Sequence, residues 1–504
     1  MRLSLVVALV VIAALRIAST YRVFSDTADE ANHVGAGLEL YQSHSYTVQD
    51  WNPPLPRLVL AAAPYLGGMR RNMHVDFSRQ LQSIFSNGKY ERDLVLARVG
   101  NLLFFALAAI AVWLLARRVL DETQALIALA LFTTQPVILG YSALATHDTA
   151  AIAGTALALL AFVRWLDEPS RKRAAVFGVA FGFGALCKFS CIPFVGIACL
   201  VLLMFRRRKR GADVSSARPR GSAAIAAHER TRRPFPYDLQ LAIAPVTAFA
   251  TIAVGYAFHL APFFDGIRGI VALDREGFLS YALGRYTMHG WWWYFPLAFA
   301  LKTTLALVLL FVAGAIFGNR EWTLVTLAMI LPALPSSLDI GIRYILPVYV
   351  PFSIAVAAMC RRRIIIAALL AWHLVASTLA HPDYFPYFNE IAARHPQRFL
   401  VDSNLDWGQD LLRLARYCRK HHINALAYTL FSPSDPNRIG LPQQVDIDWR
   451  TPPKVPAALS ESTIALARAD WPFAYSWADA LPYVRVGKSI RVYNSGQWPV
   501  ASGR

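Results

Sequence analysis

Charged residues are scarce in this chain: they make up 16% of its 504 residues, whereas 56% are hydrophobic. This composition excludes an ordinary soluble protein, in which roughly 25% of residues are charged. Apolar runs of about 18 residues or more are typical of membrane-spanning helices. The length of the chain allows about a dozen such helices together with a polar domain.

Cysteine is also rare. The five cysteines are Cys187, Cys191, Cys199, Cys360 and Cys418, and the first four lie in or next to apolar runs. An odd, scattered set excludes a disulfide framework. Cys187 and Cys191 lack histidine partners and the spacing of a zinc site. We expect all five to be small buried side chains.

Acidic residues are too few to balance the basic ones, and the net charge is +18. The basic residues lie in short clusters between apolar runs, as in the cytoplasmic loops of inner-membrane proteins, which argues against nucleic-acid binding. The first apolar run resembles a signal peptide, but no small-x-small cleavage site precedes the acidic motif that follows. We therefore expect an uncleaved first helix.

Eleven apolar runs predict a mainly α, polytopic membrane protein. They lie at 3–22, 93–115, 122–141, 149–166, 174–187, 190–205, 238–260, 296–317, 322–338, 343–359 and 363–380. Basic clusters follow the even-numbered runs, which predicts a cytoplasmic N-terminus, a periplasmic C-terminus and a location in an inner membrane. Glycines and Pro193 favour a break near Lys188, and a single helix over 174–205 would reverse every later loop.

Three polar segments complete the predicted organisation. Residues 23–92 form a large first extracytoplasmic loop, with an amphipathic piece at Asp76–Phe85, and residues 206–237 form a flexible basic cytoplasmic linker. Residues 1–380 make up the transmembrane part, and residues 381–504 a small C-terminal extracytoplasmic α/β domain. Within that domain we expect strands at 399–402, 425–431, 462–468 and 484–493, and a helix at 407–420 capped by Asp406.

Ionisable residues gather at the predicted outer face. The acidic stretch Asp26–His33 contains Asp29, Glu30 and His33, and a Trp-Asn-Pro-Pro-Leu string with Asn52 follows. Other outer connections add His147, Asp148, Lys188, Lys302, Arg343 and Tyr344. Charges at membrane depth are costly and usually mark a cavity or a path. We therefore expect these residues to line one pocket.

The residue types fit the transfer of a sugar from a polyprenyl phosphate. The acceptor must lose a proton near the anomeric carbon, and Asp29 suits the role of general base. The departing phosphate needs cations, and Lys188 and Arg343 suit that role. Glu30 could hold the acceptor or the sugar hydroxyls. No cofactor is required; a divalent metal stays possible, although no ligand spacing argues for one.

Simpler interpretations of the same residues stay open. Asp29-Glu30 and His147-Asp148 could be ordinary helix-start residues. Lys188 and Arg343 could be interface anchors, and Trp291–Tyr294 a plain aromatic belt. The two prolines after Asn52 predict an extended turn before a helix.

Several strings resemble the bacterial phospholipid carrier-dependent glycosyltransferases, related to protein O-mannosyltransferases and to aminoarabinose transferases of lipid A. They are Asp29-Glu30, Asn52–Leu55, Thr146–Asp148, Cys187–Phe189, Gly290–Pro296 with Lys302, Arg343–Pro347, Tyr387–Glu390 and Asp402–Leu411. The last string is the most specific. Asn52 stands where relatives often carry His, and the tail after Phe431 lacks an expected tyrosine- and glycine-rich stretch.

The resemblance implies a GT-C membrane fold and inverting sugar transfer at the outer side of the membrane, with Asp29 at the position of the base. We expect Asp29 and Glu30 to be catalytic, and the other gathered residues to bind substrate. The expected partners are a polyprenyl-phosphate-linked hexose or pentose, a protein, lipid or polysaccharide acceptor, and membrane lipids, without nucleic acid. The alternatives are a transporter or lipid flippase, which usually shows inverted repeats that this chain lacks, and a non-catalytic scaffold or sensor.

Overall fold

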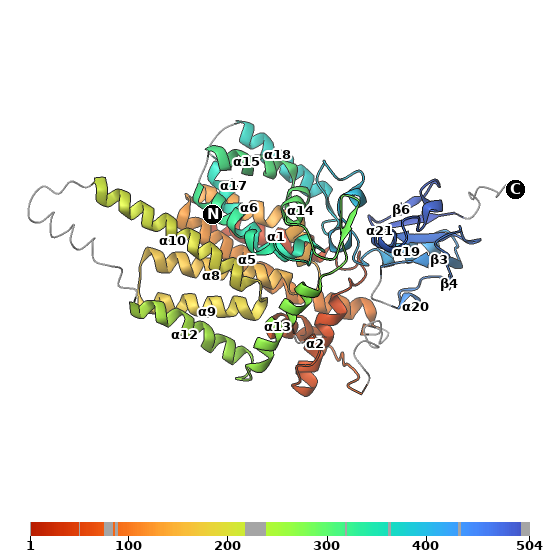
Figure 1. Cartoon of the computed structure of the whole chain (residues 1–504), viewed down its shortest axis with the longest axis horizontal. Coiled ribbons are helices and arrows are strands. Elements are labelled where there is room, and N and C mark those ends of the chain that lie inside the picture. The colour runs from red at the N-terminus through yellow and green to blue at the C-terminus, as the bar shows by residue number, and fades with distance from the viewer. Residues whose placement is uncertain are drawn as a thin grey trace, which may run out of the picture.

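The computed structural model describes residues 2–49, 51–74, 84–85, 89–216, 238–317, 320–360, 364–431 and 435–494. A helical bundle forms most of the molecule, and a small sheet lies at the C-terminal end (Figure 1). The fold class predicted from the sequence, mainly α with a small C-terminal α/β part, is confirmed. The predicted amphipathic piece at 76–85 lies almost entirely outside the described residues.

Helices occur at all eleven predicted positions, and two of these positions, 122–141 and 296–317, hold two helices each. They are α1 (Arg2–Ala18), α5 (Tyr90–Val119), α6 (Glu122–Thr134), α7 (Pro136–Ser142), α8 (Asp148–Asp167), α9 (Arg171–Cys187), α10 (Cys191–Ser216), α12 (Asp238–Gly255), α14 (Tyr294–Lys302), α15 (Leu305–Phe317), α16 (Arg320–Ala328), α17 (Tyr349–Met359) and α18 (Ile364–Leu379). The predicted break at Lys188 is confirmed, because α9 ends at Cys187 and α10 begins at Cys191. Helix α10 continues to Ser216, so the start of the expected flexible linker is helical, and residues 217–237 lie outside the described part of the chain.

Among the described residues, three helical stretches are long and apolar enough to cross a membrane. They are Tyr90–Val119, Asp148–Asp167 and Ile342–Met359, the last joining the 3-10 helix η3 (Ile342–Val348) to α17. Two predicted spans are bent: α6 and α7 meet at 57°, and α14 and α15 at 120°. Counting each bent pair as one span gives five. Pro136 begins α7, where its missing N–H and fixed φ suit a helix start.

The predicted first outer loop is largely helical. Helix α2 (Glu30–Ser43) packs against α3 (Pro54–Leu66), and the approach is so close that a Cβ on Gly37 would lie 2.2 Å from the carbonyl oxygen of Arg57. The expected extended turn before a helix is confirmed, since Pro53 is extended and Pro54 starts α3. After α12, helix α13 (Ala261–Glu276) leads to the hairpin β1 (Ser280–Ala282) and β2 (Arg285–Thr287).

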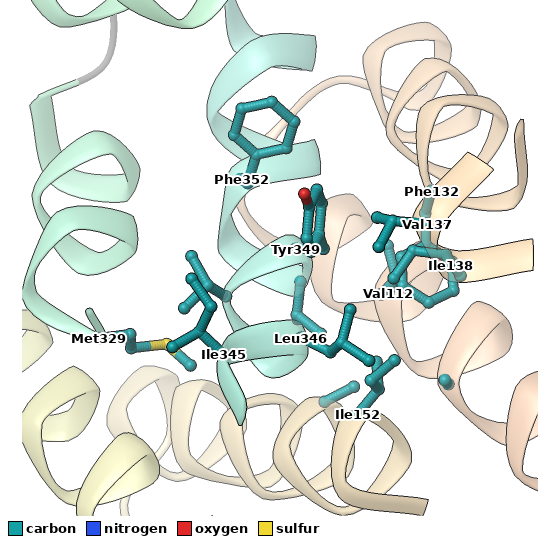
Figure 2. Packing of buried hydrophobic residues seen from close by; sticks show 14 of the residues in the cluster. Val112, Phe132, Val137, Ile138, Ile152, Met329, Ile345, Leu346, Tyr349 and Phe352 are labelled. Atoms are coloured by element: carbon teal, nitrogen blue, oxygen red, sulfur yellow. The ribbon is translucent and has the colours of Figure 1, made fainter. Parts of the chain in front are cut away.

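Apolar side chains from distant parts of the chain meet inside the bundle. Figure 2 shows Val112 of α5, Phe132 of α6 and Ile152 of α8 near Leu346 of η3 and Tyr349 of α17. All five side chains are buried. Between helices that span a membrane, contacts of this kind stabilise by close van der Waals packing and not by removing apolar surface from water. This packing holds η3, and with it the residues just before Ile345, against α8.

The C-terminal part carries a five-stranded mixed sheet in the order β4-β3-β5-β7-β6. Its strands are β3 (Ala425–Thr429), β4 (Gln443–Val445), β5 (Ala457–Ser460), β6 (Val484–Val486) and β7 (Ile490–Tyr493). The helices here are α19 (Leu411–Lys420), the short α20 (Pro436–Ile439) and α21 (Glu461–Asp470). The predicted strand at 425–431 is thus confirmed, and the one at 484–493 is a hairpin of two strands.

Three local predictions in this part are wrong. Residues 462–468 form helix α21, because the Ser460 side chain accepts a hydrogen bond from the Thr463 N–H and caps a helix there. Residues 399–402 form no strand: Leu400 makes one isolated bridge, and the chain then enters the 3-10 helix η5 (Asp402–Asn404). Asp406 does not cap α19, which begins only at Leu411; its carboxylate accepts from the Ser462 N–H at 3.0 Å.

Candidate functional site

Four separate helix ends meet at one place in the bundle. Asp29 is the N-cap residue of α2, Asp148 is the first residue of α8, Lys188 is the C-cap of α9, and Arg343 lies in η3. Helix ends project polar side chains from fixed backbone positions, so a site built from them is held by the bundle itself.

Asp29 and Arg343 form an ion pair at the centre of this cluster. Asp29 Oδ2 accepts from an Arg343 guanidinium nitrogen at 2.5 Å, and the side chains are 26% and 9% exposed. Although Asp29 stands at an N-cap position, its side chain makes no capping hydrogen bond to α2. Its carboxylate thus points toward Arg343 and does not cap the helix, so Asp29 is not an ordinary helix-start residue.

Asp148 and Lys188 form a second ion pair. Asp148 Oδ1 accepts from Lys188 Nζ at 2.6 Å, and Asp148 Oδ2 accepts from the Thr146 hydroxyl at 3.0 Å. Asp148 is completely buried, whereas the Lys188 side chain is 11% exposed. The pair therefore presents a cation, rather than an acid, to the accessible side.

Tyr344 connects the two ion pairs. Its ring centroid lies 5.2 Å from Lys188 Nζ and 5.0 Å from Arg343 Cζ, so both cations lie against one aromatic ring. Arg343 Cζ also lies 4.4 Å from the ring centroid of Trp407. The structure thus brings Asp29, Lys188 and the two neighbouring residues of η3 into a single cluster.

His33 and His147 lie in the same neighbourhood. Their ring nitrogens Nε2 and Nδ1 are 2.9 Å apart, and the rings meet edge to face. Burial lowers the pKa of His33 to about 4, even though the charges of Asp29 and Asp148 act to raise it. Burial and the nearby charge of Lys188 lower the pKa of His147 as well. Both rings are therefore neutral at pH 7, and one donates the hydrogen bond to the other.

Glu30 has surroundings different from those expected of a catalytic acid. It is completely buried and forms a two-pronged ion pair with Arg98, with both contacts at 2.8 Å. Its oxygens also accept from the backbone N–H of Thr27 at 2.8 Å and of Ala145 at 2.7 Å. Both carboxylate oxygens of Glu30 are thus engaged by the protein. These bonds join the first loop to α5 and to the residues before α8, at the position that follows Asp29 in the chain.

Asn52 and Lys302 are not part of the ion-pair cluster. The Asn52 carbonyl accepts from Arg57 at 2.5 Å, and its side chain donates to Gln49, so this residue shapes the turn before α3. Lys302 is completely buried, and its Nζ donates to the carbonyls of Phe385 at 2.9 Å and Asn404 at 2.5 Å. Lys302 thus joins α14 to the backbone of Asn404, which lies between Asp402 and Trp407 in the chain.

Two residues next to the ion-pair cluster were not among the site residues selected from the sequence. Asp402 is buried in the left-handed conformation at φ 54°; burial raises its pKa to about 6, while the charge of Arg343 opposes that rise. Trp407 is buried and covers Arg343. Both belong to the Asp402–Leu411 string, which was the signal available, but nothing in that string indicated which side chains reach the site.

The same string holds the first loop in place. The Ser25 N–H donates to the Gln409 carbonyl at 2.9 Å, and the Ala28 N–H to the Trp407 carbonyl at 3.1 Å. The Ser25 hydroxyl also donates to the Gly408 carbonyl at 2.7 Å and accepts from the Leu411 N–H at 3.0 Å. Residues 25–28 are thus bonded to residues 407–411, which sets the position of Asp29.

Acidic and imidazole groups are not arranged here for a metal ion. Among the described residues, no group of three or more His, Cys, Asp or Glu side chains could hold one. The acids of the cluster face basic side chains instead, as the two ion pairs show.

Residues 88–217 match the family model described as dolichyl-phosphate-mannose-protein mannosyltransferase. This match confirms, for that segment, the resemblance to lipid-linked glycosyltransferases that the sequence motifs predict. The matched segment carries Asp148 and Lys188. No curated protein matches the chain.

Solved structures with similar architecture come from three kinds of organism. ArnT from Cupriavidus metallidurans bound to undecaprenyl phosphate is 14% identical over 99% of this chain and 98% of that chain, with a TM-score of 0.49. AglB, an archaeal oligosaccharyltransferase from Archaeoglobus fulgidus in complex with an inhibitory peptide and a dolichol-phosphate, is 12% identical over 98% of this chain and 75% of its own, with a TM-score of 0.41. The protein O-mannosyltransferase Pmt1-Pmt2 complex of S. cerevisiae is 17% identical over 52% of this chain and 34% of that chain, with a TM-score of 0.36. All three TM-scores lie below 0.5.

Proposed function

We propose that this protein is a membrane glycosyltransferase that moves a monosaccharide from a polyprenyl-phosphate donor to an acceptor, with Asp29 as general base. The observation that carries the proposal is the ion pair between Asp29 and Arg343, next to Lys188 and Tyr344. An acid and two cations held together at the helix ends of an apolar bundle are what transfer from a lipid phosphate requires. The family-model match over residues 88–217 supports the same activity.

The donor phosphate would bind between Arg343 and Lys188. A guanidinium has five N–H donors, and Asp29 takes one of those of Arg343 at 2.5 Å. Lys188 has three donors, and Asp148 takes one at 2.6 Å. Both cations therefore retain donors for phosphate oxygens, and charge-assisted bonds of this kind strengthen as negative charge grows on the leaving group.

Asp29 would take the proton of the acceptor. As the acceptor oxygen or nitrogen bonds to the anomeric carbon, the bond from that carbon to the phosphate oxygen breaks, and the polyprenyl phosphate leaves with the electron pair. The acceptor proton goes to Asp29, whose 26% exposed carboxylate is the most accessible acid of the cluster. Attack opposite the leaving group inverts the configuration at that carbon.

Glu30 would act as a positioning residue. Its bonds to Arg98, Thr27 and Ala145 fix the backbone immediately beside Asp29. His33 and His147 lie close enough to Asp29 and Asp148 for these charges to act on His33, and, being neutral, the two rings add hydrogen-bonding groups without adding charge. They are suited to bind sugar hydroxyls.

The cluster would face the periplasm of a bacterium, with the N-terminus in the cytoplasm. This orientation rests on the basic clusters, which follow even-numbered helices. The acceptor would be a protein, a lipid or a polysaccharide at that face.

Lipid analysis of a deletion strain tests the proposed function. We expect a polyprenyl-phosphate sugar to accumulate and a surface glycan to lose one residue, and both changes to be reversed by the wild-type chain but not by Asp29→Asn. Asp265→Asn is the matched control, because Asp265 is 54% exposed on α13 and pairs only with Arg268 three residues away among the described contacts. Restoration by Asp29→Asn would remove Asp29 from the mechanism. Purified protein that moves lipid-linked sugar across vesicles without transferring it would favour a transporter.

A further inference from the structure

A cavity lies along α8 and α9, away from the ion-pair cluster. Its volume is about 760 Å³. The lining residues are Arg118, Leu157, Leu160, Ala161, Arg164, Ser170, Lys172, Arg173, Val176, Val179, Ala180 and Phe183. We call this cavity the basic-rimmed groove, because basic side chains lie at one end and aliphatic or aromatic side chains form its walls.

The groove and the candidate site lie toward opposite ends of the same two helices. Helix α8 starts at Asp148, in the site, and Arg164 lies 16 residues further along. At 1.5 Å per residue this places the two residues about 24 Å apart along the helix axis. Helix α9 lies beside α8 (Figure 1) and runs from Arg171, next to the rim residue Lys172, to Cys187, next to Lys188. Since the hydrocarbon core of a bilayer is about 30 Å thick, the two places would lie near opposite membrane surfaces.

The rim carries an excess of positive charge. Its cations are Arg118, Arg164, Lys172 and Arg173. The acids beside it are engaged: Glu168 pairs with Arg173 at 2.5 Å, and Asp167 pairs with Arg206 and, at 4.0 Å, with Arg118. Within the described part of the chain, no acidic partner is recorded for Arg164 or Lys172, and both are exposed.

The helix end and the walls add two further features. Helix α9 begins at the rim, where Ser170 caps it, so the positive end of its dipole points to the same place as the cations. The walls are apolar, and Val176 and Val179 remain 51% and 49% exposed. A soluble anion would use the rim alone, whereas a lipid with an anionic head and an acyl chain would use the rim and the walls together.

We propose that the basic-rimmed groove binds an anionic glycerophospholipid from the membrane leaflet opposite the candidate site. The phosphate would accept charge-assisted hydrogen bonds from Arg164 and Lys172, and one acyl chain would lie against Leu160, Val176 and Phe183. The lipid would thereby hold together the ends of α8 and α9 that lie far from Asp148 and Lys188. This inference rests on insertion of the bundle in a membrane and not on sugar transfer.

Lipid titration of the purified full-length protein tests the inference. Phosphatidylglycerol is added in detergent, bound lipid is counted by native mass spectrometry, and phosphatidylcholine and inorganic phosphate serve as the other probes. We expect at least one phosphatidylglycerol to bind preferentially, and Arg164→Gln/Lys172→Gln to weaken its binding by roughly 30-fold, since each basic residue near an anionic lipid contributes about a factor of five. Inorganic phosphate should neither bind measurably nor displace the lipid.

Arg268→Gln/Arg285→Gln is the control, because both residues are exposed and lie far along the chain from the rim. It should bind phosphatidylglycerol as the wild type does. Equal binding by the wild type and the rim variant, equal binding of the zwitterionic lipid, or displacement by inorganic phosphate would each overturn the proposal. Sugar transfer is measured separately, so loss of the lipid effect and loss of the enzymatic activity can be told apart.

Discussion

The carboxylate of Asp29 lies 2.5 Å from the guanidinium of Arg343, although 314 residues separate them in the chain. The contact joins the start of α2 to η3, which is packed against α8 by buried side chains such as Leu346 (Figure 2). An acidic and a basic side chain from such distant segments can meet only when the bundle is folded. Substitutions at these two residues therefore test the folded geometry of the site directly.

Asp29→Asn should abolish transfer while the protein stays folded. The amide oxygen can still accept from Arg343, but it cannot take a proton, and the loss of a general base typically lowers the rate by about 10²- to 10⁴-fold. We expect kcat to fall within this range, with little change in thermal stability, in a purified assay with a lipid-linked sugar. Asp265→Asn should retain wild-type kcat, and a comparable loss in that control would point to a nonspecific effect.

Arg343→Lys and Lys188→Ala should weaken binding of the donor. Lysine retains the charge of Arg343 but loses the planar fork that can hold a carboxylate and a phosphate together. We expect kcat/KM for the donor to fall by roughly 10- to 100-fold in each variant, through a higher KM and a lower kcat, because the lost bonds hold the phosphate and strengthen as it leaves. The readout is donor titration at saturating acceptor. An unchanged KM in both variants would argue that the phosphate binds elsewhere.

Glu30→Gln should act on stability. Both partners of the Glu30–Arg98 pair are completely buried, and removing one charge of such a pair typically costs about 3–5 kcal/mol. A catalytic acid would instead lose activity at normal stability. Thermal unfolding in detergent separates the two roles. Glu168→Gln, in which the exposed partner of Arg173 is changed, should shift the melting temperature very little.

Acidification should destabilise the protein through His33. Its pKa is about 4 in the folded protein and about 6.5 in an unfolded chain, so the unfolded state binds more protons between these values. The stability that neutral His33 contributes is therefore complete above pH 6.5 and is lost as the pH drops toward 4. Asp402 and Asp406 oppose this trend, because burial raises their pKa to about 6 and about 7.

The measurement is thus the difference between wild type and His33→Gln: the variant should lose less stability between pH 7 and pH 5. An identical pH dependence would show that His33 is accessible to protons when folded.

Gly487→Ala should loosen the attachment of the C-terminal sheet. Gly487 has φ +63°, and a Cβ there would lie 2.1–2.2 Å from the carboxylate of Asp410, which holds the backbone of Lys488 and Ser489. We expect about 1–3 kcal/mol of strain and earlier proteolysis near β6 and β7. Gly68→Ala is the control, because Gly68 also has positive φ but has no atom near the added Cβ. Equal effects in both variants would assign the loss to backbone strain alone.

The positions of the helices could be predicted because apolar runs and their interruptions carry that information locally. Lys188 between two short runs is an example: it ends α9, as the charge pattern predicted. The bends could not be predicted, since the 120° turn between α14 and α15 depends on what packs around it. In the C-terminal part, residues 462–468 were predicted as a strand but belong to α21, whose start is capped by Ser460. A short apolar run does not distinguish a strand from a helix by itself.

The candidate site could be predicted in part. Asp29, Lys188 and Arg343 were expected together from residue type and topology, and the structure brings them together. Glu30 was expected beside Asp29 as a second working acid, yet one helical step turns it into the bundle toward Arg98. The order of two neighbouring acids in the sequence does not specify which one is buried. That depends on the basic side chains that distant segments place next to each of them.

The backbone bonds between residues 25–28 and 407–411 have a consequence for the order in which this chain becomes active. Asp29, Lys188 and Arg343 are synthesised before Trp407. Until residues 407–411 are made, the segment that carries Asp29 lacks the hydrogen bonds that fix its position. A chain that ends before Trp407 would therefore contain Asp29, Lys188 and Arg343 but lack the bonds that fix residues 25–28 next to Asp29, and we expect such a chain to be inactive in the proposed transfer.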